Sequence, residues 1–427
     1  MEEKKEKLTR QEICWILYDV GNSAFILLVS TIIPIYFNSL ASLAGLSEVD
    51  YLAYWGYAAS VSTIIVALIG PVLGAMADTK GFKKPLFALC MAVGAAGCVL
   101  LSFPSHWLVF LAVFVIAKVG YSASLIFYDS MLTDITLPQR LDQVSSQGYA
   151  WGYLGSCIPF VISLLFVLFH DSMGISMKLA ITIAFFLNGA WWVLMSVPLL
   201  KQYQQIHYVE MPKNPVGSSF RRLAETLGDI RGHKQIFLYL LAFFFFIDGV
   251  YTIIEMATAY GSALGLDSSQ LLLALLATQI VAFPCALIFA ALSKRQETSR
   301  LLKFCILAYV GISLFAIQLD KPWEFWLLAV LVGMFQGGIQ ALSRSYFARI
   351  IPAEKSGEYF GIYDICGKGA SFLGTTLVGI VAQATGAANA GVAMLAVLFL
   401  MGYVLFGRVA VLEKKCYNSD RSVRSPH

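Results

Sequence analysis

Twelve stretches of this sequence are apolar over at least 18 residues, and each ends at charged or turn-forming residues. A bilayer core about 30 Å thick needs about 20 apolar residues in a helix that crosses it, so each stretch is long enough to span a membrane. The expected spans are 13–38, 52–77, 85–103, 107–129, 147–169, 177–199, 235–260, 270–292, 301–319, 323–345, 358–383 and 388–411.

Only 13% of the residues are charged and 58% are hydrophobic, whereas a soluble domain carries about 25% charged residues. The apolar runs therefore cannot all be buried in soluble cores. The sequence predicts an all-α, polytopic membrane protein, and it excludes soluble enzymes, nucleic-acid binders and disordered proteins.

The longest polar stretch separates the sixth span from the seventh. We therefore expect a short tail (1–12), a six-helix bundle (13–200), a linker (201–234), a second six-helix bundle (235–412) and a C-terminal tail (413–427). Within the linker, residues 219–231 place apolar side chains at helical spacing, which predicts an amphipathic helix.

Basic residues fall almost entirely on one side of the predicted membrane. Of the 30 Lys and Arg residues, 26 lie in the tails, the linker and alternate loops, and only Lys178 and Lys321 lie on the other side. Cytosolic loops carry the excess of Lys and Arg. We therefore predict that both tails and the linker are cytosolic, in a multi-pass protein of the cell membrane.

Catalytic and metal-binding patterns are not found in the sequence. The eight cysteines are scattered singly, and no HExxH, GxSxG or Walker lysine loop occurs. We expect no catalytic residue, no metal site and no cofactor, and therefore not an enzyme. The expected partners are a small-molecule substrate and the lipid bilayer, without nucleic acid, for a monomeric protein.

The loop after the second span reads GPVLGAMADTKGFKK, from Gly70 to Lys84. It matches the GxxxDxxGxKK signature of the major facilitator superfamily, which this chain therefore resembles. The resemblance implies two six-helix pseudo-repeats and a cytosolic lock between them in the outward-facing state. The corresponding loop, 293–300, lacks the Asp and Gly, so the pattern does not predict a second lock. The residues that the motif assigns to gating are Gly74, Asp78, Gly81, Lys83 and Lys84.

A narrower resemblance rests on YDVGNSAF (18–25), FYDSMLTDI (127–135), QGYAWGYLGS (147–156), GGIQALSRSYFARIIP (337–352) and FGIYDICGKGASFLG (360–374). These motifs are similar to the vacuolar-effluxer-like branch of the superfamily. That branch is named for a fungal autophagy-related protein implicated in amino-acid release. The short tails and the lack of Asn-x-Ser/Thr sequons indicate a bacterial member. Val20, Gly21 and Asp129 depart from the commoner Trp, Ala and Asn, and these departures weaken any transfer of substrate.

Ionisable residues inside membrane helices are costly, so each is a candidate for function. In this superfamily the first, fourth, seventh and tenth helices line the central cavity. Asp129 and Arg344, near the ends of the fourth and tenth spans, are candidates for gating. The candidates for substrate binding or coupling are Asp19, Asn22, Lys118, Tyr121, Asp248, Tyr251, Glu255, Gln336, Gln340 and Lys368.

Two structural interpretations compete with these assignments. Asp364 and Lys368 are four residues apart and can neutralise each other on one helix. Lys118 and Asp248 can form an ion pair between the two halves.

We predict a transporter that moves a small polar or zwitterionic solute by alternating access, with amino acids or short peptides favoured. Five acidic residues against two lysines within the spans favour proton coupling, with Glu255 as the proposed proton carrier. The aromatic content of 14% leaves an amphiphile, lipid or drug exporter as the alternative. A membrane sensor or scaffold that does not transport is the alternative from another class.

Overall fold

The computed structural model describes residues 7–210, 215–263, 267–319, 321–385 and 388–424. Within these ranges, 12 helical segments are long and apolar enough to cross a membrane. They coincide with the twelve predicted spans, so the predicted all-helical membrane fold is confirmed. The described residues are almost entirely helical.

The first six crossings form one half of the molecule, which we call the N-half. The first crossing is divided at Thr31, because Pro34 in the next turn cannot donate a backbone hydrogen bond to Ser30. The elements are α1 (Arg10–Ser30), α2 (Ile32–Leu43), α3 (Glu48–Ala77), α4 (Lys83–Leu100), α5 (Trp107–Ile135), η1 (Pro138–Arg140), α6 (Leu141–Leu168) and α7 (Met177–Gln202).

The last six crossings form the C-half. The final helix runs on to Arg424, so the predicted C-terminal tail begins as a continuation of the last crossing rather than as a separate segment. Residues 412–424 contain no Gly or Pro that would stop it. The elements are α9 (Lys234–Ala263), α10 (Ser268–Leu292), α11 (Thr298–Ala316), α12 (Pro322–Ile350), η2 (Ala353–Lys355), α13 (Ser356–Thr385) and α14 (Ala388–Arg424).

The linker helix α8 (Pro215–Gly232) covers the predicted amphipathic segment. Its Leu223 and Ile230 side chains lie against the hydrophobic core. The Arg222 guanidinium donates to the carbonyl of Ala75 at 2.5 Å and to the hydroxyl of Thr79 at 3.3 Å. A cation at the C-terminal end of α3 complements that helix's free carbonyls, so α8 is fastened to the N-half.

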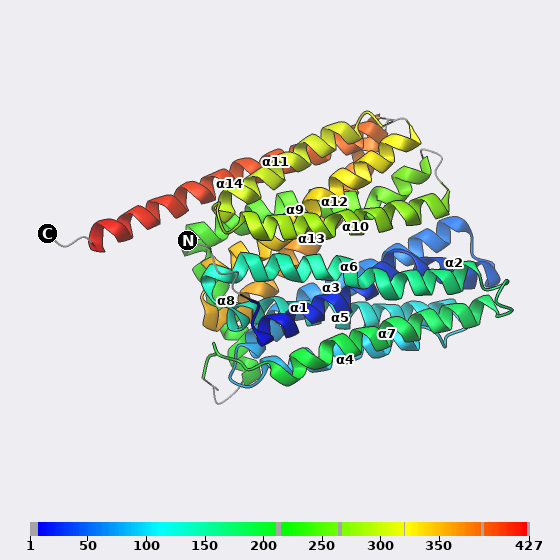
Figure 1. The fold of residues 1–427 in the computed structure, drawn as a ribbon, viewed down its shortest axis with the longest axis horizontal. Helices are drawn as coiled ribbons and strands as arrows, with labels where there is room; N and C mark the ends of the chain where they lie inside the picture. The colour runs from blue at the N-terminus through cyan, green and yellow to red at the C-terminus, as the bar shows by residue number, and fades with distance from the viewer. Residues whose placement is uncertain (1–6, 211–214, 264–266, 320, 386–387, 425–427) are drawn as a thin grey trace.

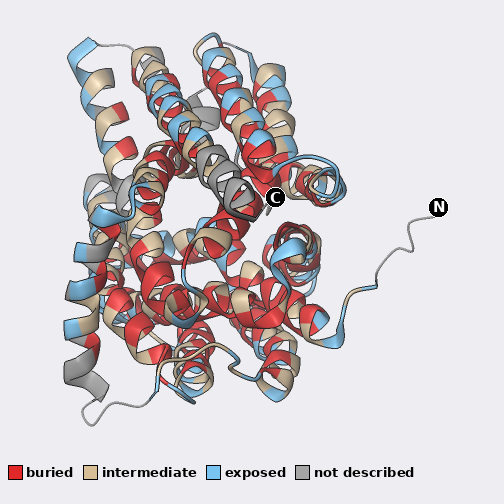
Figure 2. Cartoon of the chain, turned by 90° about the vertical axis from the view of Figure 1, so that its left-hand side faces the viewer, coloured by how far each residue is buried: buried red, intermediate tan, exposed pale blue. Residues whose placement is uncertain are grey.

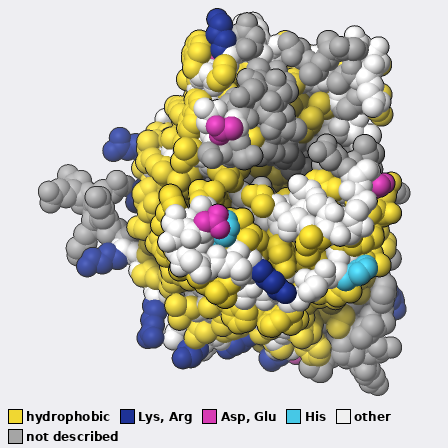
Figure 3. All heavy atoms as spheres, turned by 90° about the vertical axis from the view of Figure 1, so that its right-hand side faces the viewer, with side chains coloured by type: hydrophobic (Ala, Val, Ile, Leu, Met, Phe, Trp, Pro, Cys, Tyr) yellow, Lys and Arg dark blue, Asp and Glu magenta, His cyan; other side chains and the backbone are white. Residues whose placement is uncertain are grey.

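The two halves lie side by side, with α1 beginning and α14 ending at the same end as α8 (Figure 1). We call this the linker end and the opposite one the far end. Figure 2 looks onto the linker end and shows buried residues lining the interior of both helix groups. Figure 3 shows the far end, where few basic side chains stand among apolar and neutral ones. This distribution agrees with the asymmetry of basic residues in the sequence.

The halves meet where α3 packs along α13 and α6 packs along α10. A Cβ atom on Gly74 would lie 2.1 Å from the carbonyl oxygen of Gly357, so α3 and α13 approach too closely there for any side chain. Gly70, one turn earlier on α3, instead faces Ile126 of its own half. The two glycines of α3, four residues apart, therefore serve two different contacts.

Candidate functional site

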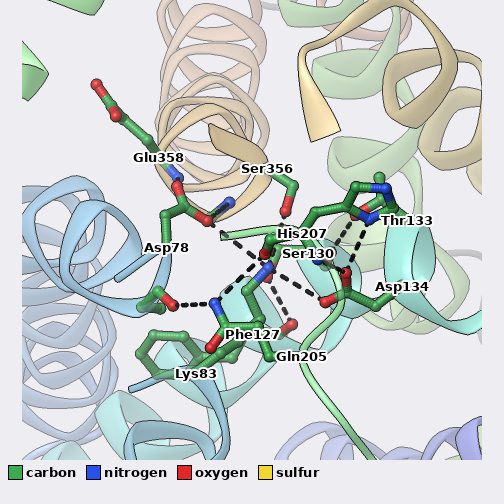
Figure 4. Close-up of polar contacts among 12 residues, drawn as sticks. Asp78, Lys83, Phe127, Ser130, Thr133, Asp134, Gln205, His207, Ser356 and Glu358 are labelled. Carbon is green, nitrogen blue, oxygen red and sulfur yellow. Dashed lines mark hydrogen bonds and ion pairs between the residues drawn. The ribbon is translucent and has the colours of Figure 1, made fainter. Parts of the chain in front are cut away.

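Asp78 lies directly after α3 and is fully buried between the halves. Its carboxylate oxygens accept the backbone N–H groups of Gly357 at 2.7 Å and Glu358 at 2.9 Å. These amides belong to the first turn of α13, where a helix has free N–H donors and favours negative charge. A carboxylate of the N-half thus caps a helix of the C-half, as Figure 4 shows.

Lys83 completes this contact from the first turn of α4. Its buried ammonium donates to the hydroxyl of Ser356 at 2.9 Å. It also lies 3.6 Å from a carboxylate oxygen of Asp78 and 3.6 Å from one of Asp134 (Figure 4). We call Asp78, Lys83, Ser356, Gly357 and Glu358 the first gate. One lysine therefore serves two carboxylates at a contact between the halves.

The other motif residues shape or flank the first gate. Gly81 has φ of +81°, a conformation that glycine adopts without strain, and it turns the chain from α3 toward α4. Gly74 gives the close approach described above. Lys84 follows Lys83 in α4 and is half-buried.

Burial raises the pKa of Asp78 from 3.8 to about 7, and Lys83 with the amides of Glu358 and Gly357 opposes part of that rise. Desolvation penalises the charged form of the carboxyl, while the cation and the N–H donors favour it. The first gate therefore contains a carboxyl that titrates near neutral pH.

The start of the linker is fastened over the first gate, which sequence reasoning missed. Asp134 accepts the Tyr203 hydroxyl at 2.6 Å and the His207 backbone N–H at 2.9 Å, and its carboxylate lies 3.0 Å from His207 Nδ1. The backbone N–H of Val209 donates to the carbonyl of Asp78 at 2.7 Å. Residues 203–209 are therefore fixed to the N-half beside the first gate.

A second polar contact joins the halves around Asp142, in the first turn of α6. Its carboxylate accepts the hydroxyls of Thr298 and Ser345, each at 2.5 Å, and the guanidinium of Arg349 at 2.9 Å. Arg349 also donates to Thr298 at 2.6 Å. We call these four residues the second gate.

The start of α11, at the end of the loop 293–300, therefore takes part in a second contact between the halves, which the loop's lack of Asp and Gly did not predict. In this contact the carboxylate belongs to Asp142 on the facing helix α6, so the loop 293–300 does not have to supply one. The loop side contributes a hydroxyl instead. In the first gate the loop supplies the carboxylate, whereas in the second gate the loop side supplies a hydroxyl donor. The presence or absence of Asp and Gly in the loop therefore does not reveal this second contact.

Arg344 of α12 forms a third contact between the halves. Its guanidinium is 2% exposed and donates to Asp129 at 3.0 Å, to the Ser145 hydroxyl at 2.9 Å and to Asp19 at 3.3 Å. Sequence reasoning assigned Asp19 to binding or coupling, and it assigned Asp129 and Arg344 to gating. The structure brings these three residues to one place.

Asp248 lies at the middle of α9 and is fully buried. Its Oδ1 accepts the backbone N–H of Gly374 at 2.9 Å and the hydroxyl of Thr252 at 3.3 Å. A Cβ on Gly374 would lie 2.2 Å from this oxygen, so a glycine is required on α13 at this point. The carboxyl is thus held in the interior of the C-half.

The two lysines within the spans have different surroundings. The Lys368 ammonium lies 2.5 Å from the Asp364 carboxylate on its own helix, so the predicted neutralisation of this i, i+4 pair is present. The Lys118 ammonium lies 5.9 Å from the centre of the Phe114 ring.

The remaining candidates lie on four helices. Asn22 donates to the carbonyl of Tyr18 at 2.9 Å, beside Asp19. Tyr121 packs on the rings of other N-half aromatic residues. Tyr251 and Gln340 are half-buried. The Glu255 side chain lies outside the part of the chain that the structure describes.

Gln336 is buried on α12 and lines a cavity of about 110 Å³ inside the C-half. The other lining residues are almost all apolar and come from α9 to α14, with Thr252, Thr278 and Gln279 as the polar exceptions.

Comparison with known proteins agrees with this architecture. The sequence model of the family described as "Vacuole effluxer Atg22 like" matches residues 8–417. An uncharacterised MFS-type transporter of Bacillus subtilis, YxiO, is 41% identical over 409 residues, which cover 95% of this chain and 96% of that protein. Autophagy-related protein 22 of Coccidioides immitis is 22% identical and is matched over 83% of this chain and 72% of its own length. The chain spans about half the length of other fungal relatives, such as 48% of autophagy-related protein 22-2 of Aspergillus clavatus.

Solved structures of major facilitator transporters have the same fold. The human organic anion transporter MFSD10 superposes with a TM-score of 0.69 at 15% identity, covering 94% of this chain and 100% of that one. The transporter FucP in the outward conformation gives 0.66 at 13% identity, covering 94% and 97%. The match to the family model and the relative at 41% identity both extend over nearly the whole chain. The chain therefore belongs to the vacuole effluxer Atg22-like family and is a transporter of the major facilitator superfamily.

Proposed function

We propose that this transporter moves a small polar or zwitterionic solute across the cell membrane by alternating access, with amino acids or short peptides as its substrates. The observation that carries the proposal is that the first gate, the second gate and Arg344 all join the halves near the linker end. Contacts gathered at one end are those that a rocking pair of bundles must break and remake.

The linker end faces the cytosol in this proposal, with both termini on that side. The basic residues counted on that side support it, since cytosolic loops carry the excess of Lys and Arg. The arrangement then corresponds to a state closed toward the cytosol, and FucP in the outward conformation has the same fold.

This orientation can be tested with single cysteines. Ser47 and Gln270 are exposed at the far end, whereas Lys80 and Arg300 are exposed at the linker end. The neighbouring residues Thr79 and Ser299 are buried, so cysteines placed there would not be accessible to the label from either side. Cysteines at 47 and 270 should react with an impermeant maleimide in intact cells, and those at 80 and 300 only after lysis. Labelling of 80 and 300 in intact cells would reverse the orientation.

The solute class is inferred from the ionisable groups in the middle of the helices. Asp248 is a buried carboxyl that can compensate the ammonium of a zwitterion, because an ion entering the membrane interior needs an opposite charge. Lys118 and Lys368 are the corresponding candidates for its carboxylate. Proton coupling is part of the proposal, since acidic residues outnumber basic ones in the spans.

The test is uptake of pooled radiolabelled amino acids and dipeptides into proteoliposomes, with and without an imposed pH gradient. We expect uptake by the wild type and its loss in Asp248→Asn for substrates that carry an amine. Asp50→Asn, an exposed residue at the far end of α3, is the matched control and should transport normally. Wild-type uptake in Asp248→Asn would refute the assigned role, and no uptake of any pooled solute would refute the substrate class.

The C-half cavity favours one further candidate substrate. Its apolar lining and volume of about 110 Å³ suit an aliphatic or aromatic group, so an amphiphile is the second candidate. Competition of long-chain amines with amino-acid uptake would distinguish the two.

A further inference from the structure

The guanidinium of Arg344 comes from the C-half, but the hydrogen-bond acceptors and aromatic rings that hold it come from the N-half. Two carboxyl groups and one hydroxyl hold its nitrogens. Its carbon lies 4.3 Å from the ring centre of Tyr149, 4.6 Å from that of Trp15 and 5.4 Å from that of Tyr128. We call these N-half residues the cation box: Trp15, Asp19, Tyr128, Asp129, Ser145 and Tyr149.

Two aromatic walls of the cation box are held by contacts within the N-half, whereas the Ser145 hydroxyl donates to the carbonyl of Ala341 in the C-half at 2.8 Å. The Trp15 ring donates to the Tyr128 carbonyl at 3.0 Å and stacks on the Tyr128 ring at 4.3 Å. A Cβ on Gly148 would lie 2.6 Å from the Asp19 carboxylate and 3.0 Å from Trp15, so glycine leaves the space that the box needs. The stacked aromatic wall and the space beside Asp19 are therefore built by the N-half itself.

This division between the halves has a direct consequence for alternating access. If the bundles move as units, Arg344 leaves the box when the linker end opens. Two carboxyl groups and three ring faces then lose their cation, and desolvated carboxylates need a replacement charge. In the open state the box is then an empty pocket that can hold a cation of the size of a guanidinium.

We propose that the cation box is a binding site for an ammonium or guanidinium group of a solute, filled by Arg344 when the linker end is closed. This inference rests on the proposed alternating access. Ring faces at these distances attract organic cations, and a guanidinium is weakly hydrated and easily stacked. A compact, strongly hydrated metal ion gains less from such walls. Closure returns Arg344 to the box and displaces the solute.

The test is rescue of Arg344→Ala by methylguanidinium, with the full-length protein in nanodiscs. Methylguanidinium should raise the melting temperature of this variant and bind it roughly tenfold more tightly than Na⁺ does at equal ionic strength. Arg221→Ala removes an exposed arginine and leaves Arg344 to compete for the box, so it should bind methylguanidinium more weakly than Arg344→Ala does. Adding Asp19→Asn to Arg344→Ala should abolish the rescue. Equal effects of Na⁺ and methylguanidinium, or stabilisation by acid alone, would overturn the proposal.

A second measurement uses the wild type, in case Arg344→Ala does not fold. Spin labels at positions 80 and 300, exposed on opposite halves at the linker end, report opening of that end. Because the solute binds only the open state, methylguanidinium should shift the label distances to longer values, and Na⁺ should not. Unchanged distances with both cations would contradict the proposal.

These assays need no transported substrate. Methylguanidinium binding without amino-acid uptake would therefore refute the proposed substrate and leave the cation box, whereas uptake without methylguanidinium binding would refute the cation box alone.

Discussion

The two gates occupy corresponding places in the two halves but are built from different chemical groups. In the first gate, a carboxylate from the loop between α3 and α4 binds backbone amides of α13. In the second gate, a carboxylate on α6 binds side-chain hydroxyls and a guanidinium from α11 and α12. Pseudo-repeats can thus keep the position of a contact while exchanging which side supplies the acid.

The two gates also differ in how far their charged side chains are buried. The Asp78 and Lys83 side chains are fully buried, whereas Arg349 of the second gate is 30% exposed. Removing one partner of a buried pair leaves the other charge desolvated, whereas a partly exposed partner is solvated by water. The first gate should therefore contribute more to closure, and graded substitutions can test this ranking through the 80–300 label distance and transport rate.

The largest effect is expected from Asp78→Asn. The Asn side chain has one acceptor oxygen where the Asp78 carboxyl has two, so the substitution breaks one of the two amide contacts and leaves Lys83 without its nearest carboxylate, which costs the closed state about 3 kcal/mol. The linker end should open in most molecules, and transport should slow while folded yield stays nearly intact. Asp50→Asn, in the first turn of α3 at the far end, is the control. Wild-type transport in Asp78→Asn would mean that the motif is vestigial here.

The next effect is expected from Gly74→Ala. The added methyl group would lie 2.1 Å from the Gly357 carbonyl oxygen, and such overpacking costs about 2 kcal/mol. The closed state alone bears this cost, so label distances should lengthen. Gly56→Ala on the same helix, where a Cβ meets nothing within 4 Å, should leave the distances unchanged. Normal closure in Gly74→Ala would show that α3 and α13 do not need this approach.

A smaller effect is expected from Asp142→Asn. Water can solvate the exposed part of Arg349, so the loss should be about 1 kcal/mol, or a fivefold change in the ratio of closed to open molecules. Asp171→Asn at the far end, with a 91% exposed side chain, is the control. An effect equal to that of Asp78→Asn would reverse the ranking of the gates.

The smallest effect is a pH dependence of closure. The pKa of Asp78 is about 7 when buried and returns toward 3.8 when opening exposes the carboxyl to water. The closed state therefore binds more protons, and the resulting stabilisation, complete below about pH 4, is lost as the pH rises through 7.

From about pH 6.5 to about pH 8, the ratio of closed to open molecules should fall about fourfold in the wild type. Asp78→Asn should lose this dependence, and Asp142→Asn should keep it. A dependence that persists without Asp78 would assign it to another group.

Much of the fold follows from local sequence. A membrane-length apolar run satisfies its own backbone only as a helix, so twelve runs fix twelve crossings without reference to the rest of the chain. The motif around Asp78 was also readable, because its residues lie within one loop. The division of the first crossing at Thr31 could have been anticipated from Pro34, but residues 13–38 were predicted as one unbroken span.

The site was only partly readable. Sequence reasoning selected Asp19, Asp129 and Arg344 singly, because each is costly in a membrane helix, but it could not place them together. The role of Asp142 was missed, since an acid in the first turn of a helix is ordinarily a favourable interaction with that helix's own dipole.

The sequence by itself determined the helices, their number, the division into halves and one gate, because these depend on residues close together in the chain. Only the tertiary structure decided that Asp142 meets Arg349 and that Arg344 enters a box built by the other half. Asp142 and Arg349 are separated by 207 residues, and Arg344 is separated by 199 or more from the box residues that accept its hydrogen bonds. Their contact depends on how two bundles dock, and apolar periodicity does not specify this, since lipid and protein both accept an apolar face.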